Sequence, residues 1–176
     1  MIEETIYLCD ENNFDEDGNT LTKYSYRAII LNDDKILLAH VNRYGDYRFP
    51  GGKIDEGETV EDGLTREVLE EVGGIVTSIV PYAHIVTKNI EKITRNFDFF
   101  ILDSFYYICK IEDELVVPNL DEAEIRDGFN REWISVTEAI AANKKVLNSN
   151  NVPLVIQRET RMLEIIRDRL LTKQKV

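Results

Sequence analysis

The sequence predicts a single domain of the α/β class. Segments with strand-like composition lie on both sides of one segment whose apolar residues recur about every four positions, and two further helix-like segments follow near the C-terminus. A chain of 176 residues with 43% hydrophobic and 31% charged residues is suited to burying one core. No repeat, linker or low-complexity stretch divides it, so we expect one domain over residues 1–176.

Strands are expected where β-branched and aromatic residues gather, at residues 24–31, 35–41, 74–87, 92–111 and 131–136. The first two flank the turn sequence NDD, which predicts a β-hairpin. Residues 14–20 (FDEDGNT) are expected to form a turn, because aspartate, glycine and asparagine suit its backbone. Residues 112–130 are expected to form a loop with some order.

The first helix is expected to begin after Thr59 and to stop at Gly73 and Gly74. Thr59 and Asp62 resemble a capping box. One apolar stripe for the core is expected from Val60, Leu64, Val68 and Val72.

Two more helices are expected after the strands. Ser135 and Glu138 form a second capping box, which predicts a helix to about Lys145. A C-terminal helix is expected over residues 153–171, with one apolar side formed by Val155, Met162, Ile166 and Leu170. That side would either cap the domain or form the seam of a homodimer.

The charge of the chain limits its partners. A net charge of -12 argues against a broad nucleic-acid or membrane-surface footprint, which usually needs a basic surface. The longest apolar region, residues 97–111, is interrupted by three charged residues, so no membrane span is expected. The N-terminus lacks the features of a signal peptide, and Cys9 and Cys109 are expected to be buried thiols. The expected compartment is the cytoplasm.

Three acids crowd the first predicted helix. With 3.6 residues per turn, Glu67 and Glu71 lie about 40° apart at the border of the apolar stripe, and Glu70 lies beside Glu67. Arg66 is close enough to pair with Glu70. Such a patch is costly unless a cation occupies it, and oxygen ligands without His or Cys favour Mg²⁺ or Mn²⁺. Taken alone, the same acids also fit a solvated helix face.

The spacing around these acids resembles the Nudix box, G-x5-E-x7-R-E-U-x-E-E-x-G-U, in which U is a bulky aliphatic residue. The matching residues are Gly52, Glu58, Arg66, Glu67, Val68, Glu70, Glu71 and Gly73. The last position departs from the pattern, because Gly74 replaces the aliphatic residue, which could loosen the turn after the helix. The resemblance implies an α/β/α sandwich with a mixed β-sheet and a core over about residues 24–145, to which the C-terminal helix is an addition.

The resemblance also implies a reaction, the Mg²⁺-dependent hydrolysis of a nucleoside diphosphate linked to another moiety. Metal ligands would be Gly52 through its carbonyl, Glu67, Glu70 and Glu71. Catalytic roles would fall to Glu67, Glu70, Arg66 and a distal acid. Arg66 would orient Glu67, and Glu67 or the distal acid would take a proton from the attacking water, whose pKa the metal lowers.

The distal acid is assigned to Glu132, because it directly precedes Trp133 in a segment that resembles a family strand. Glu124 is the second choice, and Glu122 follows. Glu58 is expected to be structural.

The substrate stays open at this stage. A proline after the box would resemble the Nudix subfamily that acts on ADP-ribose, and a tyrosine slightly later would resemble the subfamily that acts on dinucleoside polyphosphates. Residues 87–95 (TKNIEKITR) contain neither. Nucleoside triphosphates, including oxidised ones, and nucleotide sugars therefore remain candidates. We expect the aromatic residues Tyr44, Tyr47 and Phe49 to pack in the core rather than to stack on a base. The two histidines, His40 and His84, are expected to be structural. Two roles, contact with phosphate and a solvated surface charge, explain four basic residues equally well: Arg43, Arg48, Lys53 and Arg95.

Two other functions fit the sequence less well. A catalytically silent Nudix-like domain would be expected to lack a metal acid, and none is lost here. An RNA 5′-end hydrolase is disfavoured by the acidic charge and the missing basic stripe.

Overall fold

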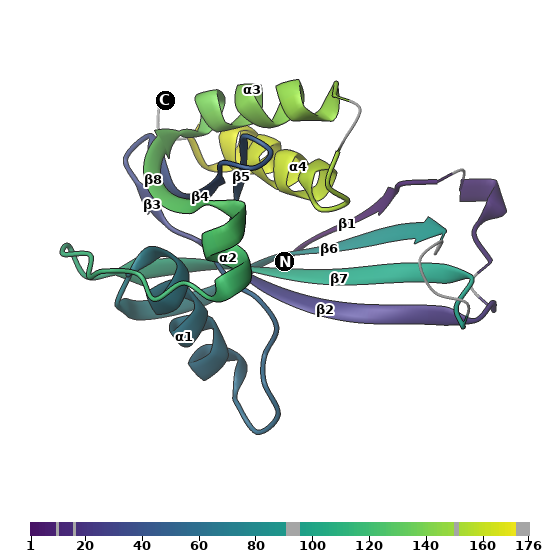
Figure 1. The fold of residues 1–176 in the computed structure, drawn as a ribbon, viewed down its shortest axis with the longest axis horizontal. Coiled ribbons are helices and arrows are strands. Elements are labelled where there is room, and N and C mark those ends of the chain that lie inside the picture. The colour runs from purple at the N-terminus through teal and green to yellow at the C-terminus, as the bar shows by residue number, and fades with distance from the viewer. Residues whose placement is uncertain (10, 16, 91–95, 150–151, 172–176) are drawn as a thin grey trace.

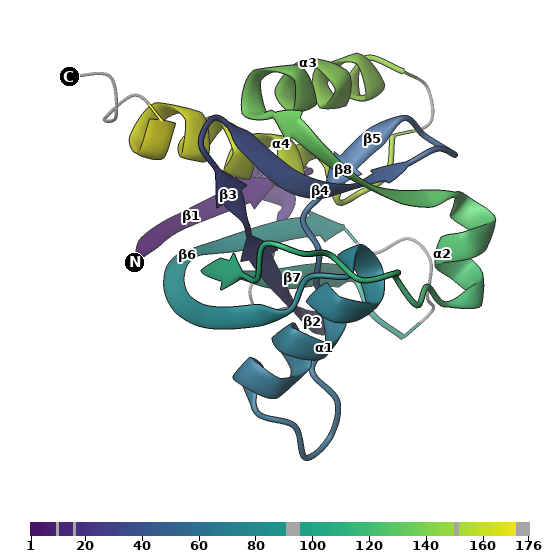
Figure 2. The ribbon, with the colours of Figure 1, turned by 90° about the vertical axis from the view of Figure 1, so that its left-hand side faces the viewer.

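The computed structural model describes residues 1–9, 11–15, 17–90, 96–149 and 152–171. Two β-sheets form the middle of the molecule. Helix α1 (Val60–Val72) lies on one side of them, and helices α3 (Val136–Leu147) and α4 (Ile156–Ile166) lie on the other (Figures 1 and 2). The α/β/α sandwich and the added C-terminal helix are therefore confirmed.

One sheet is mixed, with the strand order β1-β6-β7-β2. The outer strands each run parallel to their neighbour, and the two inner strands are antiparallel to each other. Its strands are β1 (Ile2–Tyr7), β2 (Thr20–Ile29), β6 (Val76–Ile90) and β7 (Phe99–Ile111). Strand β1 was not predicted, and the start of the strand expected from residue 92 lies partly outside the described residues.

The other sheet is antiparallel and is centred on β4 (Lys35–Val41), which pairs with every other strand of the sheet. The remaining strands are β3 (Leu31–Asn32), β5 (Asp46–Arg48) and β8 (Phe129–Ser135). The predicted hairpin exists only at its turn, where β3 pairs with β4. The preceding residues 20–29 instead pair in parallel with β7, so a hairpin over residues 24–31 was wrong.

The helices follow the predicted signals closely. Helix α1 has Thr59 as its N-cap and Gly73 as its C-cap, and Ser135 caps α3 by accepting the N–H of Glu138. Helix α4 begins at Ile156 and continues into a π-helical turn, η2 (Arg167–Leu171). Within the segment expected to be a loop lies a short helix, α2 (Glu122–Asp127), and a 3₁₀ turn, η1 (Glu11–Asn13), precedes β2.

Apolar side chains form two clusters, one on each side of the sheets. Alternation along β4 supplies both: Ile36 and Leu38 face the cluster shared with α3 and α4, and Leu37 faces the cluster under α1. On α4, Met162 and Ile166 are fully buried in the first cluster. The apolar side of this helix therefore caps its own domain. None of the described helices is both long and apolar enough to cross a membrane.

Candidate active site

Helix α1 holds its acids in a fixed frame. The Thr59 hydroxyl accepts the N–H of Asp62 at 3.1 Å, and Gly73, with φ of 69°, closes the other end by donating to the Leu69 carbonyl at 3.0 Å. Leu64 and Val68 are fully buried against the sheets. The N–H of Gly74 donates to the Val68 carbonyl at 3.2 Å, so the departure from the family pattern does not open this turn.

Two glycines bring the preceding loop against β2 and α1. Gly51 has φ of 131°, and a Cβ there would lie 2.1 Å from the Tyr26 carbonyl oxygen. At Gly52 a Cβ would lie 2.6 Å from Glu67 Oε2. At Gly51 only glycine allows the loop to pass this close to the backbone of β2, whereas at Gly52 an added side chain would displace the carboxylate of Glu67. The two glycines place the loop directly beside the carboxylates of α1.

Arg66 links the acids of α1 to the loop before the helix. Its Nε and Nη2 donate to the two oxygens of Glu58 at 2.8 and 2.9 Å, and this guanidinium lowers the pKa of Glu58 to about 2. Its Nη1 donates to Glu67 Oε1 at 2.7 Å and to Glu70 Oε2 at 3.1 Å. Glu58 thus fixes Arg66, and Arg66 contacts two of the candidate metal acids.

Glu71 is the most deeply buried acid of the helix, with 7% of its surface exposed. Its Oε2 accepts the N–H of Gly51 at 2.9 Å. Burial raises the pKa of Glu71 to about 8, although the charge of Arg27 and the Gly51 N–H favour the ionised form. Burial also raises the pKa of Glu67. At both carboxylates the effect of burial outweighs that of the arginine charges nearby, and a bound cation would offset it.

A pocket of about 240 Å³ opens beside these acids. It brings together Glu67, Glu71 and Gly52 from the Nudix-like motif and Glu124 from α2. The rest of its wall is Arg27, Arg48, Phe49, Gly51, Phe129, Val155 and Arg158. Three acidic residues and three arginines therefore line one cavity, and two of these arginines, Arg48 and Arg158, are already paired with Asp46 and Glu159.

Two predicted site residues point elsewhere. Glu70 does not line the pocket and is turned toward Arg66. Glu132 is exposed on β8, where its Oε2 accepts the hydroxyl of Tyr47 at 2.9 Å. Successive strand residues face opposite sides, and Arg131 takes the side of α1, donating to the Val72 carbonyl at 3.1 Å. Glu132 consequently lies away from the acids of α1.

Of the three candidates for the distal acid, Glu124 is the one in the pocket. Asp121 caps α2 by accepting the N–H groups of Ala123 and Glu124 at 2.7 and 2.8 Å, and Glu124 Oε2 accepts the Asp121 N–H in return at 2.8 Å. The charge of Glu124 contributes to the raised pKa of Glu71, so the two carboxylates are close enough to interact. Glu122 is exposed and lines no part of this pocket.

Arg27 and Arg158 are pocket residues that the sequence reasoning missed. Arg27 lies within a segment predicted to be a strand, and nothing in the sequence around it indicates a site residue. Arg158 and Glu159, however, interrupt the apolar side of the last predicted helix, and both are buried. A charged pair within an apolar stripe is a usable signal for a buried polar site.

The remaining sequence candidates have mostly structural environments. Tyr47 and Phe49 belong to the core, as predicted, and His84 Nε2 lies 3.0 Å from Asp103 Oδ1. His40 stacks on Tyr47, and Tyr44 lies under the guanidinium groups of Arg43 and Arg48.

Arg43 pairs with Asp127 at 2.8 Å, Lys53 lines a separate depression, and Arg95 lies outside the described residues. Both cysteines are free, Cys109 buried as expected and Cys9 only half-buried.

The donor set of the pocket fits a hard divalent cation, because its anionic ligands are all carboxylate oxygens. In the described parts of the chain, no three His, Cys, Asp or Glu side chains are already gathered closely enough to hold a metal. Glu67, Glu71 and Glu124 would therefore have to converge when a cation binds, and Glu70 would have to leave Arg66 to join them.

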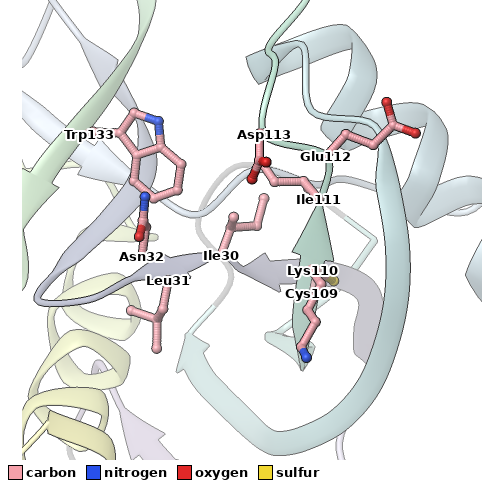
Figure 3. Close-up of a pocket in the computed structure, with 9 residues that line it drawn as sticks. All are labelled: Ile30, Leu31, Asn32, Cys109, Lys110, Ile111, Glu112, Asp113 and Trp133. Carbon is pink, nitrogen blue, oxygen red and sulfur yellow. The ribbon is translucent and has the colours of Figure 1, made fainter.

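A second depression, of about 430 Å³, lies apart from these acids (Figure 3). Trp133 and Asn32 form one wall, and Ile111 and Asp113 face them across Ile30. The candidate residues of α1 do not line it.

Comparison with known proteins agrees with the geometry. The family model described as the NUDIX domain matches residues 22–155. The RNA pyrophosphohydrolase of Sulfurovum sp. (strain NBC37-1) is 35% identical over 116 residues, covering 58% of this chain and 73% of that protein. The uncharacterized Nudix hydrolase YvcI of Bacillus subtilis is 28% identical over 103 residues, covering 55% of this chain and only 58% of that protein. The oxidized purine nucleoside triphosphate hydrolase of Mus musculus is 42% identical over 61 residues, covering 33% of this chain and 39% of that protein.

Solved structures share the fold at low sequence identity. The E. coli ORF135 protein superposes with a TM-score of 0.53 at 21% identity, covering 85% of this chain and 94% of that one. A NUDIX hydrolase from Nitrosomonas europaea gives a TM-score of 0.52 at 22% identity, covering 79% of this chain and 88% of that one. These likenesses show the arrangement of layers.

Proposed function

The chain belongs to the Nudix family, and we propose that it is a pyrophosphohydrolase acting on a nucleoside diphosphate linked to another moiety. The observation that carries this proposal is the pocket that Glu67, Glu71 and Gly52 line together with three arginines. Buried carboxylates suit a divalent cation, and arginines suit the phosphates of a substrate.

Mg²⁺ is the proposed cofactor, with Mn²⁺ as a substitute. Glu67, Glu70 and Glu71 would be its ligands, and the Gly52 carbonyl, which already accepts the Tyr26 N–H at 2.9 Å, would add a fourth oxygen. Bound there, the cation would lower the pKa of the attacking water and neutralise charge on the diphosphate.

The chain's own groups would then divide the work of hydrolysis. The water oxygen forms a bond to one phosphorus while the bridging P–O bond breaks, and the freed phosphate leaves with the bridging oxygen. A carboxylate takes the proton of the water. Glu67, oriented by Arg66 at 2.7 Å, is one candidate base, and the distal acid is the other. Glu124 is better placed for that second role than Glu132.

The substrate is proposed to be a small nucleotide. Two relatives bear names that point to different substrates, RNA 5′ ends and oxidised purine nucleoside triphosphates. The net charge of -12 disfavours a long nucleic acid, because no broad basic surface would hold its backbone. Nucleoside triphosphates, including oxidised ones, and nucleotide sugars remain the proposed classes.

A cytoplasmic location is also proposed, and the two free thiols support it because disulfides are rare in that compartment. A homodimer stays an expectation from the sequence. The buried apolar side of α4 is not free to form its seam.

The test is a panel of nucleotides incubated with Mg²⁺, with released phosphate and pyrophosphate measured for each. We expect the wild type to turn over at least one member and Glu71→Gln to be slower by at least about 100-fold, because the variant loses a charged oxygen at the metal. Glu61→Gln, which changes an exposed acid on the same helix, is the matched control and should retain activity. No turnover of any member by the wild type would favour a catalytically silent domain instead.

A further inference from the structure

The acid pocket is small for a whole nucleotide. Its volume is about 240 Å³, whereas sites for small organic ligands usually enclose about 300 to 1,000 Å³. The nucleoside part of the proposed substrate would therefore extend beyond it. Two other hollows of the surface are large enough to receive that part, one of about 480 Å³ and the depression of about 430 Å³ beside Trp133.

The larger of these hollows, here called the tyrosine hollow, adjoins the acid pocket. Its lining residues are Thr22, Lys23, Tyr24, Tyr26, Lys53 and Ile54. Lys53 directly follows Gly52, which lines the acid pocket, and the N–H of Tyr26 donates to the Gly52 carbonyl at 2.9 Å. A ligand in the tyrosine hollow would thus lie one residue along the loop from the proposed metal site.

A row of stacked aromatic rings ends at the tyrosine hollow. Tyr26 on β2 stacks on Phe105 on β7 with ring centroids 5.3 Å apart, and Phe105 stacks on His84 on β6 with centroids 4.4 Å apart. The row crosses neighbouring strands, and β2 is the edge strand of the mixed sheet (Figure 1). Since no described strand of this sheet lies beyond Tyr26, the outer face of its ring is turned toward the loop that carries Ile54.

The other walls of the tyrosine hollow suit a flat apolar ring. Tyr24 lies two residues before Tyr26, on the same face of β2. It is 54% exposed and is the only exposed aromatic residue in the part of the chain that the structure describes. Ile54 is held against α1, since a Cβ at Gly63 would lie 2.5 Å from its Cδ1. The hollow therefore offers aromatic surface on one side and aliphatic surface on the other.

Charge distinguishes the tyrosine hollow from the depression beside Trp133. The described residues lining the tyrosine hollow include two lysines and no acid, and neither Lys23 nor Lys53 forms an ion pair with a described residue. The depression beside Trp133 has the acids Glu112 and Asp113 in its wall (Figure 3). The negative charge of a nucleotide therefore favours the tyrosine hollow.

We propose that the tyrosine hollow binds the nucleobase of the substrate, with the base stacked on the outer face of Tyr26. The proposal rests on the proposed function, which makes the substrate a nucleotide, and adds the place of its base. Stacking on an aromatic side chain tolerates any base, because every base has a π-face. The base would extend the row of Tyr26, Phe105 and His84 by one ring, while the diphosphate passes Gly52 to reach the acids of α1.

Two kinds of probe separate the base from the phosphates. Methylenediphosphonate is an uncleavable diphosphate without a base, and the α,β-methylene analogues of ADP and GDP join the same group to a nucleoside. The variant Tyr26→Leu removes the ring and keeps the backbone N–H that binds Gly52. In calorimetric titrations with Mg²⁺, we expect it to bind the tighter of the two nucleotide analogues at least about fivefold more weakly than the wild type. Its affinity for methylenediphosphonate should stay within about twofold.

Tyr7→Leu is the matched control, because Tyr7 is a half-buried tyrosine on β1, at the opposite edge of the same sheet. It should bind every probe as the wild type does. Unchanged nucleotide affinity in Tyr26→Leu would overturn the proposal, and so would an equal loss for both kinds of probe. Quenching of the fluorescence of Trp133, the one tryptophan of the chain, together with unchanged affinity in Tyr26→Leu, would place the base in the other depression.

If circular dichroism shows that Tyr26→Leu does not fold, the wild type decides the matter. Nuclear Overhauser effects are then expected between the base protons of the bound analogue and the ring protons of Tyr26. Their absence at saturation, or no binding of either nucleotide analogue by the wild type, would overturn the proposal. The nucleotide panel measures hydrolysis separately, so a base bound elsewhere would leave the proposed activity standing.

Discussion

The carboxylates of Glu124 and Glu132 lie in different parts of the molecule. Glu124 lines the pocket and raises the pKa of Glu71, whereas Glu132 is bonded to the Tyr47 hydroxyl on the other side of the sheet. We therefore predict that Glu124→Gln lowers kcat at least about tenfold, through a lost proton acceptor or metal ligand. Glu132→Gln should change kcat less than about twofold. Steady-state kinetics with a nucleotide that the panel identifies would measure both.

Glu122→Gln is the control for this comparison, because Glu122 is exposed on the same short helix and lines no part of the pocket. A large loss of kcat in Glu132→Gln, with Glu124→Gln near the wild type, would restore the assignment made from the sequence. That assignment relied on the neighbouring Trp133. Chain proximity could not reveal which side of β8 the carboxylate takes, since the alternation of a strand depends on its register with β4.

The roles within the Nudix-like motif were easier to anticipate than the distal residues. Arg66 and Glu70 are four residues apart, so their contact follows from helix spacing, whereas the contact of Arg66 with Glu67 was implied only by the resemblance to the family motif. Arg27 and Arg158 reach the same pocket from a strand and a helix that are far apart along the chain. Nothing local to either residue identifies its partners, so only the tertiary fold shows them.

The loop that carries Gly51 and Gly52 lies between β2 and α1 and positions the candidate site against both elements. A side chain at Gly51 would strain a backbone with φ of 131° and contact the Tyr26 carbonyl oxygen, whereas a side chain at Gly52 would meet the carboxylate end of Glu67. We predict that Gly51→Ala destabilises the fold by about 1–3 kcal/mol, which lowers Tm by roughly 2–12 °C. Gly52→Ala should leave Tm within about 2 °C of the wild type and lower kcat at least about tenfold, because Glu67 is displaced.

Thermal unfolding followed by circular dichroism, with kinetics on the same samples, would measure both variants. Gly57→Ala is the control for the backbone term alone, since its φ is also positive at 89° but no atom lies within 4 Å of an added Cβ. A Gly52→Ala variant with full activity would show that the loop does not set the position of Glu67.

Local signals predicted the helices well and the sheet pairing poorly. The caps at Thr59, Gly73 and Ser135 are short-range interactions, and the structure contains each of them. The parallel pairing of β2 with β7, by contrast, joins segments far apart in the sequence, since Thr20 pairs with Phe99. The turn sequence NDD predicted a hairpin between two long strands. However, β2 belongs to the mixed sheet, and the strand that pairs with β4 across this turn is the short β3, Leu31 and Asn32.

The layered architecture explains how the whole molecule assembles one site. Figure 2 shows α1 on one side of the sheets and α4 on the other. Residues of both helices, of the glycine loop and of α2 line one pocket. The C-terminal helix therefore both closes the core and contributes to the pocket. The pocket gathers three arginines in this way, although the protein as a whole is acidic.

We propose that the acids of α1 hold a divalent cation, and metal binding can be measured without knowledge of the substrate. Mn²⁺ titrations followed by electron paramagnetic resonance would compare the wild type with Glu71→Gln, using Glu61→Gln as the control. We predict that Glu71→Gln weakens Mn²⁺ binding at least about tenfold, because it removes a ligand charge, and that Glu61→Gln binds as the wild type does. Equal Mn²⁺ affinity in all three proteins, or no binding by the wild type, would contradict the claim.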